Sequence, residues 1–277
     1  MPQKESPAAG KLRSPYGGTI SYPPYSPNLA VLHTHEVCEI YCVFRGNGYY
    51  VTEGTQHKLE HGKLILMRPG EAHKVFLTGN EPYDRIVHNF PVSAVDAIDP
   101  ERRLLAPFFN RPLGMHNAYP RSAVSSTKIY DLFTQLHADM GDEYATKLNT
   151  SLTLFSILSE LKALFDAGAY MSPAEGTQQM HAVLEYINEH LTGDLCVERI
   201  CRKFFLSRSQ LNRGFRAATG TTVWDYVMTK RLLRAKMYIS DGMRAGDAAS
   251  ACGFRDYSSF YRSYVRKYGV SPSGARE

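Results

Sequence analysis

Residues 206–220 and 254–269 carry one helical pattern twice, offset by 49 positions. In each copy, apolar residues at helical spacing lie opposite polar and basic residues, and each copy ends at a glycine that can cap a helix. The offset aligns Ser209 with Ser258, Leu211 with Phe260, Arg213 with Arg262, Phe215 with Tyr264 and Gly220 with Gly269. A repeated helix with one buried and one basic face predicts two units that contact the same polyanion, and duplex DNA fits best.

A shorter helix is expected before each copy, over residues 198–204 and 247–252. Ser207 and Asp256 are good N-cap residues for the helices that follow. Helix, tight turn and capped helix form the helix-turn-helix arrangement, whose second helix enters the major groove of DNA. The polar side chains of these second helices are the expected DNA contacts: Arg208, Ser209, Gln210, Asn212, Arg213, Arg216, Tyr257, Ser258, Ser259, Tyr261, Arg262 and Arg266.

The periodicity by itself fits an ordinary helical bundle with a solvated charged face equally well, and the charge distribution favours DNA. Residues 181–277 hold 16 Lys and Arg against 9 Asp and Glu, a net of +7, whereas residues 1–180 have a net of −2. Neutralisation of phosphates by Lys and Arg dominates non-specific DNA binding. A long helix is expected to join the two units, because its apolar residues follow 4-4-3-4 spacing: Trp224, Met228, Leu232, Ala235 and Ile239.

The C-terminal region resembles the signature of the AraC/XylS-type bacterial transcription regulators, over about residues 181–277. The residues that match are Tyr186-Ile187, Leu206-Ser207, Leu211, Phe215, Thr219-Gly220, Tyr226, Arg231-Leu232, Ala235, Gly253-Phe254, Asp256, Phe260, Tyr264, Gly269 and Ser271-Pro272. The chain departs from the family pattern at Ala245, Ala248-Ala249 and Ala275, where larger side chains are usual. These departures thin the expected core of the second unit, which would make it less stable or less firmly docked.

The N-terminal half has the pattern of an all-β domain. Short β-branched or aromatic segments are broken by Gly, Pro or Asn: 17–22, 29–35, 38–45, 48–53, 55–59, 63–67, 73–77 and 83–90. The sequence Arg45–Gly48 is a hairpin turn signal. About eight strands at close spacing predict a small barrel or jelly roll.

His33, His35 and Glu39 alternate along extended chain, and His73 on a later strand could complete the set. Three imidazoles and one carboxylate could hold a first-row transition metal, and the pattern resembles the metal motif of cupin enzymes. The sensor domains of AraC-type regulators also resemble cupins, and there the resemblance implies ligand contacts or structural hydrogen bonds. We therefore expect no metal and assign these four residues to effector binding. Further candidates are Tyr41, Arg45, Arg85 and His88, although Arg85 fits an external ion pair equally well.

Two helices are expected between the barrel and the DNA-binding region. The first has the apolar spacing Ile129, Leu132, Phe133, Leu136 and Met140, and the second Leu148, Leu152, Phe155, Leu158, Leu161 and Phe165. The second also carries surplus apolar residues, Leu154, Ile157 and Leu164, which fit a dimer interface or a thick core. The family resemblance favours the dimer. Residues 166–176 are small, polar and Pro/Gly-bearing, as in an interdomain linker.

We therefore expect an α+β chain of two domains: a cupin-like β-barrel or jelly roll with flanking helices, then an all-α domain of two helix-turn-helix units joined by a long helix. The expected boundaries are a flexible arm over residues 1–16, a sensing and dimerisation domain over 17–166, a linker over 167–178 and a DNA-binding domain over 179–277. The five cysteines form no CxxC pair, and no apolar run is long enough to span a membrane, which favours a cytoplasmic protein.

The expected function is a small-molecule-controlled transcription regulator, not an enzyme and without a cofactor. Its expected partners are double-stranded promoter DNA, an effector (a sugar or related metabolite), RNA polymerase and a second copy of the chain. The alternative is a cupin metalloenzyme with an accessory nucleic-acid-binding domain. A third hypothesis is a constitutive DNA-binding protein with a vestigial barrel.

Overall fold

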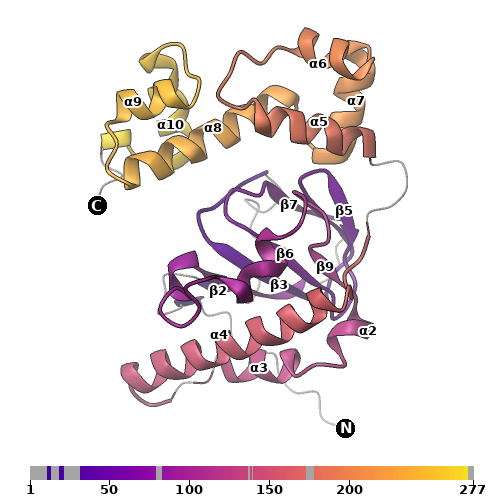
Figure 1. The fold of residues 1–277 in the computed structure, drawn as a ribbon, viewed down its shortest axis with the longest axis vertical. Helices are drawn as coiled ribbons and strands as arrows, with labels where there is room; N and C mark the ends of the chain where they lie inside the picture. The colour runs from indigo at the N-terminus through magenta and orange to yellow at the C-terminus, as the bar shows by residue number, and fades with distance from the viewer. Residues whose placement is uncertain are drawn as a thin grey trace.

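The computed structural model describes residues 11–13, 19–21, 32–78, 83–136, 138, 140–172 and 178–273. In Figure 1 a sheet domain lies below a helical domain, and two helices, α3 and α4, cover the far side of the sheets. The expected two-domain α+β fold is confirmed. The predicted arm over residues 1–16 lies outside the described residues except at β1 (Lys11–Arg13), which pairs with β2 (Thr19–Ser21). Among the described helices, none is both long and apolar enough to cross a membrane.

Besides the β1–β2 pair, two larger antiparallel sheets form the described part of the N-terminal domain. The four-stranded sheet has the order β8 (Asp84–Phe90), β3 (Cys38–Arg45), β6 (Leu64–Met67) and β9 (Ala118–Tyr119). The three-stranded sheet has the order β5 (Thr55–Lys58), β4 (Gly48–Thr52) and β7 (His73–Leu77). Residues from both sheets, among them Tyr41, Tyr50 and Val75, share one buried cluster. The two sheets therefore pack face to face, as in a jelly roll.

Strand β3 is buried on both faces, which explains its nearly continuous apolar sequence. Tyr41 and Val43 point between the two sheets. Ile40 and Cys42 point the other way, into a core shared with the helices. Along β3, residues that point between the sheets therefore alternate with residues that point toward the helices, as pleating requires.

The hairpin prediction at residues 45–48 is wrong. Strands β3 and β4 do not pair with each other, so this turn carries the chain from one sheet to the other. The hairpin lies at Glu53-Gly54, where Thr52 pairs with Thr55 and both turn residues have positive φ, 44° and 89°. Two residues with positive φ fit the type I′ turn, whose twist matches that of the paired strands.

Four short helical segments follow β8 in the described chain: η2 (Val92–Ala94), η3 (Arg103–Leu105), α1 (Ala106–Phe109) and α2 (Arg121–Val124). After them come α3 (Ile129–Leu136) and the long helix α4 (Glu143–Asp166). Helix α3 ends at Leu136, so Met140 lies beyond it and is exposed, contrary to the prediction.

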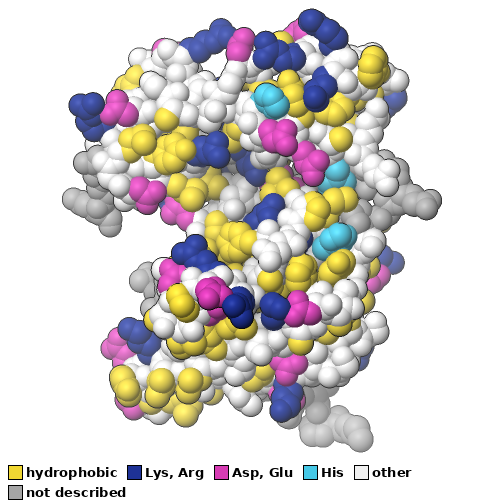
Figure 2. Space-filling view, in the orientation of Figure 1, with side chains coloured by type: hydrophobic (Ala, Val, Ile, Leu, Met, Phe, Trp, Pro, Cys, Tyr) yellow, Lys and Arg dark blue, Asp and Glu magenta, His cyan; other side chains and the backbone are white. Residues whose placement is uncertain are grey.

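Helix α4 packs on the sheet domain with the residues that the sequence suggested were surplus and with part of the predicted stripe. Leu154, Ile157 and Leu164 are buried in the core. Tyr144, Leu148 and Leu152 are exposed at 76%, 46% and 58%, and Phe155, on the same side, is half-buried. Leu158 and Leu161 of the predicted stripe are also buried, so the prediction holds for them, whereas Leu148 and Leu152 of the same stripe are exposed. A helix that is apolar all round gives no signal for which of its residues pack on the core. Figure 2 shows hydrophobic side chains gathered at the lower left, where α4 begins.

The first part of the predicted linker packs on the sheet domain. The backbone N–H of Met171 donates to Ala118 O at 2.7 Å, and the Tyr170 ring stacks on His116 at 4.3 Å between centroids. Helix α5 then begins at Gln178. Residues 173–177 of the predicted linker lie outside the described residues.

Six α-helices make up the described part of the C-terminal domain. They are α5 (Gln178–Glu189), α6 (Val197–Phe204), α7 (Arg208–Thr219), α8 (Val223–Ser240), α9 (Ala245–Ala251) and α10 (Tyr257–Tyr268). One core involves α5 to α8 and another α8 to α10, so the long helix α8 joins two helix-turn-helix units as expected. The predicted apolar stripe holds at Leu232, Ala235 and Ile239, but Trp224 is half exposed and lies near the Arg231 guanidinium instead.

Candidate effector site and DNA-binding surface

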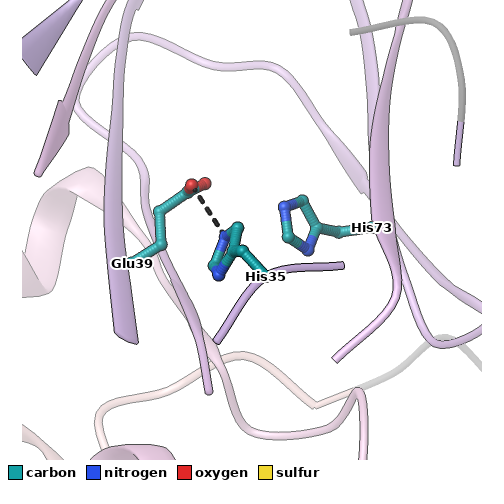
Figure 3. A group of neighbouring side chains, drawn as sticks. All are labelled: His35, Glu39 and His73. Carbon is teal, nitrogen blue, oxygen red and sulfur yellow. Dashed lines mark hydrogen bonds and ion pairs between the residues drawn. The ribbon is translucent and has the colours of Figure 1, made fainter. Parts of the chain in front are cut away.

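Four residues predicted as a cluster lie together at one end of the sheet interior. His33 and His73 form an isolated backbone bridge, and their rings lie 4.3 Å apart between centroids. His35 Nε2 lies 3.1 Å from Glu39 Oε2, and the His35 and His73 rings are 4.8 Å apart. Figure 3 shows His35, Glu39 and His73 pointing toward one another. The alternation along the chain and the β3–β7 packing therefore produce the predicted group.

The hydrogen bonds fix the protons of the two histidines. His73 Nδ1 lies 2.8 Å from Glu71 O, and because a carbonyl oxygen only accepts, this nitrogen carries the proton. Burial, together with the nearby His33, lowers the pKa of His73 to about 3, so its Nε2 is a free acceptor. His35 donates Nδ1–H to Val37 O at 2.9 Å and also needs a proton on Nε2 to meet the carboxylate.

Electrostatics agree with a charged His35. Burial would lower the pKa of His35, but the hydrogen bond to Glu39 and its charge outweigh burial and raise it. Burial would raise the pKa of Glu39, but the bond from His35 and the charges nearby lower it to about 2. Tyr50 donates a second hydrogen bond to Glu39 Oε1 at 3.0 Å. The carboxylate is thus ionised and has two partners.

This group also has the donor set of a metal site. One ligand atom from each of His35, Glu39 and His73 lies within 4.8 Å of the others. Both histidines fix Nδ1 on a backbone carbonyl, which orients Nε2 as metal-binding histidines do. A first-row metal would replace the Nε2 proton of His35.

The remaining predicted effector residues separate into two groups. Tyr41 is buried in the interior, with its ring 4.4 Å from that of Tyr50, and Arg85 is buried on the same side of the sheet. Arg45 instead forms an exposed pair with Asp84 at 2.5 Å, because a register shift in β3 displaces the end of the strand. His88 is buried but stacks on Phe90, on the side that faces the helices.

Several buried polar atoms of the interior face have no hydrogen-bond partner among the described residues. They include Tyr41 Oη, Thr52 Oγ1, His73 Nε2, Arg85 Nε and Nη1, and Asn89 Oδ1. Buried polar groups are nearly always hydrogen-bonded, so a group of unsatisfied atoms marks a place for polar ligand atoms or water. Tyr50 belongs to this site and sequence reasoning missed it, although it alternates with Thr52 on β4.

Helix α7 has the geometry predicted for a DNA-reading helix. Ser207 Oγ accepts from Gln210 N at 3.1 Å, and Gln210 Oε1 accepts from Ser207 N at 2.8 Å, a complete capping box. The left-handed Gly220 ends the helix with φ of 69°. Leu211 and Phe215 are buried. The exposed predicted contacts are Arg208, Ser209, Gln210, Asn212, Arg213 and Arg216.

Two of these side chains already have intramolecular partners. Gln210 belongs to the capping box, and Arg208 forms an ion pair with Glu198 of α6. Arg213 and Arg216 are exposed and form no ion pair within the described part of the chain, so they are better candidates for contacts with DNA.

Helix α10 repeats the arrangement. Asp256 accepts from Ser259 N at 2.6 Å, Phe260 and Tyr264 are buried, and Gly269 ends the helix with φ of 74°. The predicted contacts Tyr257, Ser258, Tyr261, Arg262 and Arg266 are exposed, while Ser259 is half-buried. Figure 2 shows Lys and Arg side chains along the upper edge of the helical domain.

Comparison with known proteins agrees with both halves of the structure. Residues 28–159 match the AraC-like ligand binding domain, and residues 200–277 match a helix-turn-helix domain. This chain belongs to the AraC-type family of transcription regulators. It is 24% identical over 258 residues to the HTH-type transcriptional activator RhaR of Cronobacter sakazakii, covering 90% of this chain and 87% of the relative. It is 25% identical to RhaS of Citrobacter koseri, covering 88% and 87%.

Solved structures are also similar in part. The DNA-binding domain of AdpA, solved in complex with a target DNA, is 29% identical, covers 34% of this chain and 86% of that chain, and has a TM-score of 0.33. ToxT from Vibrio cholerae is 11% identical, covers 87% and 90%, and has a TM-score of 0.38.

In this AraC-type regulator the two domains meet through a polar interface that sequence reasoning missed. Glu53, 2% exposed, lies 2.5 Å from Lys230 Nζ and also accepts from the hydroxyl of Tyr226. Beside it, Thr55 Oγ1 lies 2.9 Å from His181 Nε2. Gln56 Nε2 donates to Ala217 O at 2.5 Å. The β4–β5 hairpin therefore rests on α5, α8 and the C-terminal end of α7.

The interface is also connected to the interior cluster. Ala72 N donates to Glu53 Oε1 at 2.6 Å, and Lys230 Nζ donates to Gly70 O at 2.6 Å. His73, the residue after Ala72, belongs to the cluster with His33, His35 and Glu39. Residues 70–73 thus connect the sheet interior to α8 within four positions.

Proposed function

We propose that this AraC-type regulator binds promoter DNA sequence-specifically through α7 and α10, under the control of a small molecule bound between the two sheets. The observation that carries the proposal is the group of unsatisfied polar atoms in the interior, connected through residues 70–73 to the domain that bears both reading helices. A closed structural core would be apolar there.

The control would act on the contact between the domains. A ligand that moves His73 also moves Gly70 and Ala72, whose backbone groups bond Lys230 and Glu53. An effector can change DNA affinity only by as much as it discriminates between two domain arrangements. This contact, which also holds the C-terminal end of α7 at Ala217, is the element whose arrangement the effector would change.

The test uses the full-length protein. Operator sequences are selected from random duplex DNA, and the affinity is then measured with and without candidate metabolites. We expect a footprint over two major-groove segments about one helical turn apart on one face of the DNA. A footprint over only one segment would contradict the proposal. So would a DNA affinity that no metabolite changes, a result that would instead favour a constitutive DNA-binding protein.

The protein is further proposed to act in the cytoplasm as a homodimer and to contact RNA polymerase at the promoter. Support for the dimer comes from α4, where Tyr144, Leu148 and Leu152 form an exposed apolar stripe at helical spacing. Two copies of the stripe could pack on each other around a twofold axis. The relatives RhaR and RhaS are named transcriptional activators, which supports activation here.

One specific observation favours a second candidate function, a cupin metalloenzyme: the donor set of His35, Glu39 and His73. We expect less than stoichiometric metal in the purified protein, because Glu39 already bonds His35 and Tyr50. Metal analysis decides between the two functions. Stoichiometric iron, manganese or zinc that is lost in His35→Ala, together with turnover of a small substrate, would establish the enzyme.

A further inference from the structure

Arg85 places a positive charge inside the sensor domain. It lies on β8 in register with Val43, whose side chain is in the interior cluster, and it is 5% exposed. Its guanidinium carbon lies 4.8 Å from the centre of the Tyr83 ring. The sequence left open whether Arg85 is an external ion pair, and the structure assigns that role to Arg45 and Asp84 instead.

Among the described residues, no carboxylate pairs with the Arg85 charge. Nε and Nη1 have no hydrogen-bond partner, and no ion pair joins Arg85 to an acidic residue in the described part of the chain. The other interior charges are already balanced, because Glu39 is paired with His35 and also accepts from Tyr50. A guanidinium stays protonated, so burying it unpaired is costly unless an anion joins it.

The interior face that carries Arg85 also offers partners for hydroxyl groups. His73 Nε2 is an unprotonated acceptor, Asn89 Oδ1 is a second acceptor, and Tyr41 Oη can donate or accept. Asn89 is in register with Glu39 on the interior face, and Tyr41 is two positions further along β3. Sites that combine one cation with several hydrogen-bonding groups select ligands with one anionic group and several polar ones.

We propose that the effector is a small hydroxylated carboxylate, such as a sugar acid, whose carboxylate binds Arg85. The proposal rests on the function proposed above and names the chemical class of its effector. In the complex, the ligand carboxylate neutralises the Arg85 charge. The hydroxyl groups of the ligand donate hydrogen bonds to His73 and Asn89. A neutral sugar satisfies the hydroxyl partners but leaves the guanidinium without an anion.

The experiment measures ligand binding to the full-length protein without DNA, by thermal shift and calorimetry. The probes are matched pairs: galacturonate with galactose, gluconate with glucose, and glycerate with glycerol, plus inorganic phosphate. We expect at least one carboxylate to raise the melting temperature and its neutral counterpart to have no effect. Arg85→Gln should weaken that binding by about tenfold or more, whereas Arg45→Gln, at the exposed pair, should leave it unchanged.

Stronger binding of the neutral member of a pair, or unchanged carboxylate binding by Arg85→Gln, would overturn the proposal. So would a preference for phosphate over every carboxylate. If no carboxylate binds, the free energy of unfolding of Arg85→Met without ligand decides whether Arg85 is a ligand-binding or a structural residue. A variant at least as stable as the wild type supports a ligand-binding arginine, since an unpaired buried charge has been removed. A clearly less stable variant would make Arg85 structural and overturn the proposal.

DNA affinity separates this inference from the proposed function. A carboxylate that binds through Arg85 but leaves operator affinity unchanged supports the ligand class and contradicts effector control. A neutral ligand that changes operator affinity supports the control and contradicts the ligand class.

Discussion

The Glu53 carboxylate lies 2.5 Å from the Lys230 ammonium, and this buried ion pair joins the sensor domain to the DNA-binding domain. Glu53 occupies the first position of a tight turn with φ of 44°, a conformation that is uncommon outside glycine. Lys230 also donates to Gly70 O, and Glu53 also accepts from Ala72 N and Tyr226. The Glu53 carboxylate and the Lys230 ammonium therefore each have more than one hydrogen-bond partner in the docked arrangement.

Glu53→Gln should loosen the docking of the two domains and weaken the response of DNA affinity to the effector. Removing one partner of a buried pair leaves the other charge uncompensated, at a cost of about 3–5 kcal/mol. Small-angle scattering measures the docking, and operator binding measures the response. The control is Glu36→Gln, which breaks the more exposed interdomain pair with Lys236 and should change little. A compact Glu53→Gln protein with a normal response would contradict the role of the pair.

Arg213→Ala and Arg262→Ala should each relax base preference at a separate position of the operator. Both side chains are exposed at equivalent positions of α7 and α10. Loss of a bidentate arginine–guanine contact costs about 1–3 kcal/mol, whereas loss of a phosphate contact weakens binding to all sequences equally. Binding to operators with single base changes distinguishes the two, and Arg103→Ala, in the sensor domain, is the control. Uniform weakening by either variant would assign that arginine to the backbone.

Leu148→Glu combined with Leu152→Glu should convert a dimer to monomers without unfolding the protein. Both side chains are exposed on α4, so the substitutions leave the core intact but place charges in the apolar stripe. Sedimentation velocity gives the oligomeric state. Lys147→Glu, exposed on the same helix outside the stripe, is the matched control. A wild-type monomer at all concentrations would refute the dimer.

The contribution of His35 to stability should fall as the pH rises. Burial lowers its pKa, but the bond to Glu39 outweighs burial and raises it above the usual value. A raised pKa in the folded state means that the contribution is complete below the unfolded value of about 6.5 and is lost as the pH rises through the folded value. The difference in melting temperature between wild type and His35→Gln should therefore shrink with rising pH. A difference that stays constant as the pH rises would contradict the raised pKa of His35.

Arg111→Met should destabilise the sensor domain by about 3–5 kcal/mol, because the buried Glu71 carboxylate loses its ion-pair partner and keeps only the hydrogen bonds from two backbone N–H groups. Both side chains are fully buried and lie 2.7 Å apart. Burial would raise the pKa of Glu71, but the charge of Arg111 lowers it to about 2, so the carboxylate stays ionised. Urea unfolding measures the loss. Arg102→Met, at an exposed pair with Asp96, should leave the unfolding midpoint almost unchanged.

The sequence by itself determined the ends of the two helices expected to contact DNA and the order of the domains. Ser207 and Gly220 mark the two ends of α7, and Asp256 and Gly269 those of α10, because caps act through hydrogen bonds and φ angles within a few residues. The grouping of His35 with Glu39 also follows from alternation along one segment.

Only the tertiary structure decided how residues far apart in the chain meet. Arg45 and Arg85 are alike in sequence terms, yet a register shift puts one at the surface and the interior face of β8 buries the other. The sequence likewise did not reveal which face of α4 packs on the core, or that Glu53 pairs with Lys230. Such choices depend on long-range packing and on the desolvation of charges, which no periodicity in a single segment encodes.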